Sequence, residues 1–370
     1  MVPIRKLWAR GVSVLLLGAA AGVNSFVIQP GAGSVSAQVQ TQVRVPLEGK
    51  PFKKLSEYGF FAGDGSAQQP NEGVLPYDLT TPLFSDYSTK FRFVWMPTGS
   101  SATYSAEDPF TFPVGSVLIK TFGFEHDLRD PSQGRRLIET RLLVHRPEGW
   151  TPYIYIWNEE QTDADLKVAG GRRMVEWTHF DGGKRSLNYV IPNLNQCKGC
   201  HISGETIIPI GPKGRNLNRD YAYANGVENQ LLRWAEAGYL TGSPEPKQAD
   251  ALPVWDDPTT GTLAERARAY LDVNCAHCHS PKGPANTTGV DLRFQQLDPH
   301  KWGVEKVPVA AGRGSGDRRF GIVPGKPDES IMIYRLESTE PGIMMPELPR
   351  LTVHEEGAAL LRQWITEMPK

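Results

Sequence analysis

The feature that most constrains this chain of 370 residues is the placement of its four cysteines. They form two copies of one pattern, in which two cysteines three positions apart are followed directly by a histidine: Cys197-Lys-Gly-Cys200-His201 and Cys275-Ala-His-Cys278-His279. This pattern is the attachment signature of a c-type haem, in which both thiols bond to the porphyrin and the histidine binds the iron. We therefore predict two covalently bound haem c groups, with His201 and His279 as iron ligands.

Two other uses of paired cysteines fit less well. A zinc ribbon also carries two Cys-x-x-Cys pairs, but these normally lie about 15–20 residues apart. Here 74 residues separate Cys200 from Cys275. A thioredoxin-like dithiol needs one such pair in a βαβ setting, whereas this chain has two that each end in histidine. Haem attachment is the interpretation that uses all four cysteines.

Residues 1–37 have the pattern of a secretory signal peptide. Three basic residues precede an apolar run from Val12 to Val23, and small residues ending at Ala37 offer a cleavage site. Asn24 and Ser25 interrupt the apolar run, which makes it short for a membrane span. We expect a periplasmic protein, cleaved near Ala37, whose mature chain has no stable membrane insertion and no structural disulfides.

The net charge of the mature chain limits the kinds of partner that it can bind. Removing residues 1–37 takes away three of the 40 basic side chains and none of the 41 acidic ones, which leaves a net charge of −4. An acidic chain is unsuited to nucleic acid or anionic membrane surfaces. We expect redox proteins as partners and no nucleic acid.

The remaining chain is long enough for two domains. We predict a β-rich module at 45–241 with the first motif, a linker at 242–261 rich in proline, glycine and acids, and a second haem module at 262–370. Apolar strand-like runs in the first module predict an antiparallel sheet. These runs are 91–95, 115–122, 137–144 and 153–157, with a hairpin signal at Asp181-Gly-Gly183 between runs 174–180 and 186–191.

The second module has helix signals at both ends. Thr262 and Glu265 form a capping box that begins a helix running into Cys275, and Thr352 begins a second capping box before a terminal helix. A short helix at 327–336 precedes the loop 341–346. Together these features resemble a class I cytochrome c domain over residues 262–368.

That resemblance implies an all-α C-terminal domain whose first and last helices cross at Ala267 and Trp364. It also implies that a loop methionine is the sixth ligand of the second iron. Met345, which precedes a proline as this ligand often does in the family, is the first choice, and Met344 is the alternative. His/Met ligation raises the reduction potential relative to two histidines.

The first haem has no methionine available between His201 and residue 242. Its sixth ligand is therefore expected upstream in the β-rich module or in the other module, or it is absent. The candidates are His126, His145, Met174 and His179. His179 is preferred among them because its hairpin leads directly into the haem segment.

Two less specific expectations concern the surroundings of the haems. Proline-bearing loops at Gly211-Pro212 and Gly283-Pro284 offer backbone carbonyls to the ligand histidines. Three arginines have the geometry to bind propionates. They are Arg313, Arg318 and Arg319.

Residues 50–370 as a whole resemble a family of exported bacterial dihaem c-type cytochromes. The likeness rests on phrases such as Pro82-Leu-Phe-Ser-Asp86 and Gly211-Pro-Lys-Gly-Arg-Asn-Leu-Asn-Arg219. The leading interpretation is a carrier that transfers electrons between redox partners and has no catalytic residues, because filled axial positions keep substrates from the iron. The resemblance itself does not choose among the possible functions. The alternative is a peroxidase-like or oxidase-like haem enzyme, or a gas-binding sensor. In either, the iron of the first haem has an open coordination position and receives electrons from the second haem. A weaker similarity of Phe112-Pro-Val-Gly115 and Lys120 to the β-sheet type of cytochrome c′ favours this alternative.

Overall fold

The structure is a computed structural model that describes residues 42–348 and 350–369. The predicted signal peptide, residues 1–37, lies outside the described residues. None of the helices in the described ranges combines the length and apolar character needed to cross a membrane.

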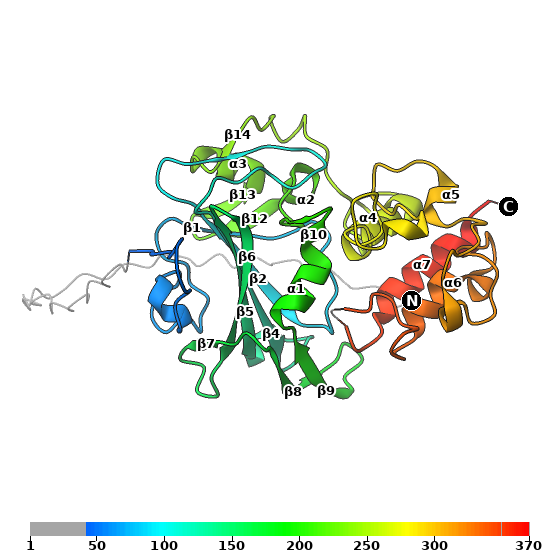
Figure 1. Ribbon diagram of the computed structural model, residues 1–370, viewed down its shortest axis with the longest axis horizontal. Helices are drawn as coiled ribbons and strands as arrows, with labels where there is room; N and C mark the ends of the chain where they lie inside the picture. Colours follow the sequence, from blue (N-terminus) through cyan, green and yellow to red (C-terminus); the bar gives the residue numbers. More distant parts are fainter. Residues whose placement is uncertain (1–41, 349, 370) are drawn as a thin grey trace, which may run out of the picture. The chain divides into compact units, whose positions relative to one another are not determined.

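The centre of the described chain is a six-stranded sheet in which every neighbouring pair is antiparallel (Figure 1). The predicted apolar runs form strands of this sheet. Their apolar residues are buried on both of its faces, which explains why the runs are nearly continuous in apolar residues. In spatial order the strands are β1 (Val74–Tyr77), β2 (Thr89–Trp95), β4 (Val117–Glu125), β5 (Arg135–Arg146), β6 (Gly149–Trp157) and β7 (Ala164–Leu166). The prediction of an antiparallel, β-rich first part is confirmed.

Consecutive residues of these strands enter different cores, as expected when side chains alternate across a sheet. Ile119 and Leu142 pack on one face with Tyr155. Leu118 and Leu143 pack on the other face, where α3 (Gln230–Glu236) contributes Trp234. The second face is the one that bears the first haem motif.

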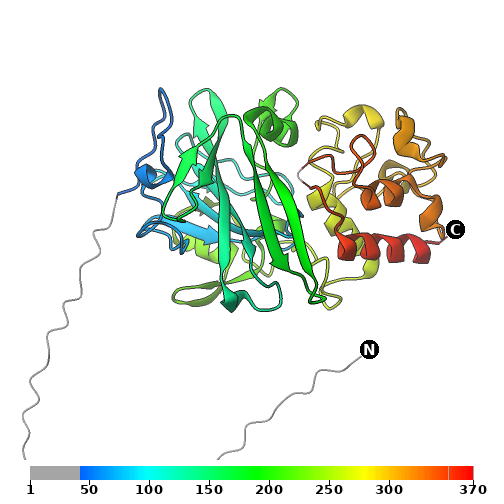
Figure 2. The ribbon, with the colours of Figure 1, turned by 90° about the horizontal axis from the view of Figure 1, so that it is seen from below.

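Smaller elements surround the sheet. The predicted hairpin around Asp181 exists as β8 (Gly171–Thr178) and β9 (Lys184–Ile191). It leads into α1 (Leu194–His201), which lies between the sheet and the C-terminal helices in Figures 1 and 2. The other elements in this part are β3 (Ala102–Thr103), β10 (Ile202–Ser203), β11 (Thr206–Ile207), α2 (Gly214–Leu217), β12 (Asp220–Tyr223), β13 (Gly226–Asn229), α3 (Gln230–Glu236) and β14 (Leu240–Thr241).

The prediction of an all-α class I cytochrome c domain at the C-terminus is wrong. The α-helices there are α4 (Leu263–Asn274), α5 (Pro299–Trp302), α6 (Ile331–Glu337) and α7 (Glu355–Glu367), with 12, 4, 7 and 13 residues. They leave most of residues 262–369 in turns, 3-10 helices and isolated parallel bridges such as Val304 to Ile322. Glycine and proline recur every few residues between α4 and α6, and they interrupt helices.

The described residues cluster as one compact unit. Contacts cross the expected boundary in several places. Leu252, within the predicted linker, is buried against Ala269 and Val273 of α4. Its backbone N–H donates to the carbonyl of Arg215. Leu252 therefore anchors the middle of residues 242–261 to α4, while most of that segment remains exposed or half-buried.

Candidate haem sites

The first motif lies on α1, and local capping places it there. Asn193 is the N-cap, and its side chain and that of Gln196 form a reciprocal capping box. At the other end of the helix, His201 Nδ1 lies 2.8 Å from the carbonyl oxygen of Ile208. An imidazole held by a carbonyl at Nδ1 keeps Nε2 for a metal. The carbonyl comes from the residue before Pro209, not from the predicted Gly211-Pro212.

A cavity of about 360 Å³ adjoins this helix. Cys197, Cys200 and His201 all contribute to its wall. The volume is within the range of about 300–1,000 Å³ that is usual for ligand sites. The first motif therefore faces a space suited to a large prosthetic group.

The second motif directly follows α4, whose predicted capping box at Thr262 and Glu265 is present. His279 Nδ1 lies 3.4 Å from the hydroxyl of Thr288, a residue that follows the predicted Gly283-Pro284 turn. Gly283 is needed in that turn, because an added Cβ would lie 2.2 Å from the carbonyl oxygen of Cys278.

A second cavity, of about 500 Å³, adjoins this motif. Cys275, Cys278 and His279 line it together with Met345. Met344 is buried and does not belong to the cavity wall. An imidazole and a thioether thus border one space, which is the donor set predicted for the second iron.

The two cavities are neighbours. Four residues line both of them: Cys200, His277, Glu347 and Leu348. One of these is a cysteine of the first motif, and another lies inside the second motif. The structure therefore brings together two motifs that 74 residues separate in the sequence.

A row of three basic side chains faces the first cavity, and no motif in the sequence predicted it. Arg92 of β2 is opposite Lys120 of β4, which is opposite Arg141 of β5. All three line the cavity. Like charges directly opposite each other destabilise a sheet. Arg92 is balanced by Asp78 and Arg141 by Glu139, whereas no carboxylate pairs with Lys120 in the described chain.

The predicted sixth ligands of the first iron lie away from its cavity, and none of the four belongs to its wall. Met174 is 65% exposed and His126 is exposed. His145 stacks on Trp150 at 4.5 Å. His179 is buried, with its Nε2 4.0 Å from a carboxylate oxygen of Glu356.

The three arginines expected to bind propionates also have other contacts. Arg313 pairs with Glu340, Arg318 donates to the carbonyl of Asp328, and Arg319 lies over Phe320. The arginine that lines the second cavity is Arg335.

Burial sets the charge of the motif side chains. It lowers the pKa of His201 to about 4 and also lowers that of His279, so both imidazoles are neutral at pH 7. Neutral imidazole is the form that binds a metal. Burial raises the pKa of Cys275 and of Cys278 to about 12, which keeps these thiols protonated.

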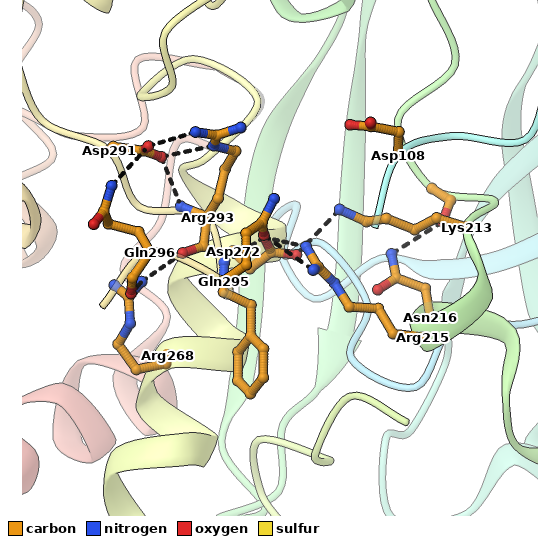
Figure 3. A network of polar contacts seen from close by, with 12 residues as sticks. Asp108, Lys213, Arg215, Asn216, Arg268, Asp272, Asp291, Arg293, Gln295 and Gln296 are labelled. Carbon is orange, nitrogen blue, oxygen red and sulfur yellow. Dashed lines mark hydrogen bonds and ion pairs between the residues drawn. The ribbon is translucent and has the colours of Figure 1, made fainter. Parts of the chain in front are cut away.

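An ionic cluster fixes α4 to the loop that follows the first motif (Figure 3). Asp272 of α4 has no exposed side-chain surface, and its carboxylate lies 2.9 Å from Arg215 and 3.2 Å from Lys213. Asp272 and Lys213 also line the first cavity. Because α4 ends just before Cys275, this cluster sets the position of the second motif relative to the first.

The residues present fit a c-type haem at each cavity. Each space has two thiols that form no disulfide and one neutral imidazole held at Nδ1. Within residues 42–348 and 350–369, no three His, Cys, Asp or Glu side chains gather as a metal site. Comparison with known proteins identified no relative: no family model, no curated protein and no solved structure matches the chain.

Proposed function

We propose that this protein is an exported dihaem c-type cytochrome that transfers electrons between redox partners in the periplasm. The observation that carries the proposal is that two cavities, each bordered by a complete Cys-x-x-Cys-His motif, share part of their walls. Shared wall residues imply a short separation between the two prosthetic groups, which electron transfer between them requires.

When bound, the two haems would supply one-electron chemistry at iron. Cys197 and Cys200 would hold the first group, and Cys275 and Cys278 the second, while His201 and His279 bind the irons. Met345 is the proposed sixth ligand of the second iron, because it borders the same cavity as His279. A site with both axial positions filled suits a carrier, since no substrate reaches the metal.

The row of basic side chains supports a carboxylate-bearing group in the first cavity. Lys120 stands between two arginines and has no carboxylate partner of its own in the described chain. A haem propionate placed there would supply the missing negative charge. Burial, with Arg92 and Arg141 nearby, lowers the pKa of Lys120 well below its usual value, and a bound propionate would favour its charged form.

Haem content tests the proposal directly. The mature chain, purified from a host that matures c-type cytochromes, should carry two haem masses and give two haems per chain in a pyridine haemochrome assay. Replacing Cys197 and Cys200 by alanine should remove one, and replacing Cys275 and Cys278 should remove the other. A wild-type mass equal to that of the polypeptide alone would refute the proposal.

A second candidate function is a haem enzyme or gas sensor with an open first iron. It is favoured by one observation, namely that no predicted sixth ligand lines the first cavity. Carbon monoxide added to the fully reduced protein separates the two functions. A carrier with both irons saturated shows no shift of the Soret band, whereas an open first site shifts about half of the haem absorbance.

A further inference from the structure

His277 occupies a position that the proposed function does not yet use. It is the second variable residue of the Cys275-Ala-His-Cys278-His279 motif, so its own motif assigns it no role. The residue nevertheless lines the first cavity together with His201 of the other motif. The same residue lines the second cavity, together with His279.

The ring of His277 also differs from the two motif histidines in its hydrogen bonding. His201 Nδ1 has the carbonyl of Ile208 at 2.8 Å, and His279 Nδ1 has the hydroxyl of Thr288 at 3.4 Å. His277 Nδ1 is buried and makes no hydrogen bond of normal geometry to any residue that the structure describes, although the backbone of Val273, one helical turn earlier, interacts with the ring. An unsatisfied buried polar atom costs about 1–3 kcal/mol. A group bound in the cavity is therefore expected to engage this ring.

We propose that His277 is the sixth ligand of the first haem iron, opposite His201. The inference rests on the proposed function, because it requires a haem in the first cavity. It supplies a sixth ligand that the four upstream candidates cannot, since none of them borders that cavity. The second motif would then bind its own haem through its cysteines and His279, and would also complete the coordination of the first.

This arrangement has a structural consequence. The first iron becomes saturated only when α4 is docked against the first haem segment. The buried cluster of Asp272 with Arg215 and Lys213 holds α4 there. His277 follows α4 by a few residues, so the cluster also positions the proposed ligand.

Two other roles for the neighbouring groups make different predictions. Lys120 lines the same cavity and is the alternative ligand in its wall. A hydrogen bond from His277 to a haem propionate would also satisfy Nδ1 without any bond to iron. Replacing the imidazole would then shift a potential but leave the spin state unchanged.

The test compares His277→Ala, His277→Met and Lys120→Leu with the wild type, all loaded with haem. Electron paramagnetic resonance of the oxidised protein counts low-spin and high-spin irons, and the Soret shift of the reduced protein counts carbon monoxide sites. We expect two low-spin irons and no carbon monoxide site in the wild type. His277→Ala should give one high-spin iron and one carbon monoxide site per chain, and added imidazole should restore the low-spin signal.

His277→Met keeps a ligating side chain, so it should remain low-spin with a raised potential at one haem. Lys120→Leu, which has no ligating atom, should keep both irons low-spin. The inference is overturned if the wild type already binds carbon monoxide, if both His277 variants keep the wild-type spectra, or if Lys120→Leu alone produces the high-spin iron. Haem content measured on the same samples tells these results apart from a failure of the proposed function, which would remove the haems themselves.

Discussion

The carboxylate of Asp86 accepts a hydrogen bond of 2.8 Å from the hydroxyl of Thr352. The same oxygen accepts from the backbone N–H groups of Leu351 and Thr352, at 2.7 and 2.8 Å. These bonds join the turn before β2 to the chain that follows Met345. They also explain why Thr352 does not cap the last helix, which begins at Glu355 with His354 as its N-cap.

Removing this acceptor should release the end of the Met345 loop. Asp86 has a positive φ of 52°, a conformation that glycine and asparagine tolerate. Asp86→Gly should therefore destabilise the protein through the lost bonds and not through backbone strain, by about 1.5–3 kcal/mol. Asp86→Asn keeps an amide oxygen and should stay close to the wild type. Urea unfolding checks both variants, and equal losses would argue against the assigned hydrogen bonds.

Met345→Ala should lower the reduction potential of one haem and leave the other unchanged. Loss of the thioether removes the ligand that raises the potential of the second site. Met344→Ala is the matched control, since Met344 is buried next to it but does not line the cavity. A spectroelectrochemical titration resolves both potentials. A shift in the Met344 variant alone would reverse the assignment.

Asp272→Asn should strongly destabilise the fold. It leaves Arg215 and Lys213 buried without a counter-charge, and breaking such a pair typically costs about 3–5 kcal/mol. Asp328→Asn, in an exposed ion pair with Arg362, should change stability little. Urea unfolding at pH 7 compares the two variants, and similar midpoints would contradict a structural role for the cluster.

The same carboxyl predicts a pH dependence. Burial alone would raise the pKa of Asp272, but the charges of Lys213 and Arg215 outweigh it and lower the pKa. Burial lowers the pKa of Lys213, yet Arg215 is a permanent cation and keeps Asp272 ionised. A carboxyl whose pKa is lowered by folding contributes stability above its unfolded pKa, near 3.9, and loses it as the pH falls through the folded value. The Asp272→Asn variant should lack this acid-sensitive part of its stability.

A second pH dependence follows from His354. Burial, with Lys90 and Arg350 nearby, lowers its pKa to about 3 even though Glu356 Oε2 lies 3.7 Å from Nε2. When folding lowers the pKa of a histidine, the free energy of unfolding decreases as the pH falls from about 6.5 toward 3, because the unfolded state binds the proton more readily. His354→Asn keeps an acceptor near Nδ1 for the hydroxyl of Tyr270, 2.9 Å away in the native protein, but does not titrate.

We therefore expect His354→Asn to lose less stability than the wild type between pH 7 and pH 4. Urea midpoints at the two pH values measure this difference. Tyr270→Phe is the control, because it removes the hydroxyl but keeps the titrating ring. Identical pH dependence in the wild type and His354→Asn would show that His354 does not contribute.

Local signals in the sequence predicted the parts of the fold that depend on near neighbours. The capping box at Thr262 lies within one helical turn, and the hairpin at Asp181 within one tight turn, so both were predicted correctly. The haem prediction also rests on a five-residue pattern. The predicted all-α fold class of the C-terminal part was wrong, because helix signals at its two ends do not determine the conformation of the residues between α4 and α6.

The chain's own sequence thus determined the strand runs, the local turns and the identity of the motif residues, since each depends on residues close together in the chain. Only the tertiary structure decided which distant residues meet. Arg92, Lys120 and Arg141 form a row through strand register, and His277 reaches the first cavity through the docking of α4. Register and docking depend on the packing of whole surfaces, whose energy is spread over many distant contacts, so no short segment carries that information.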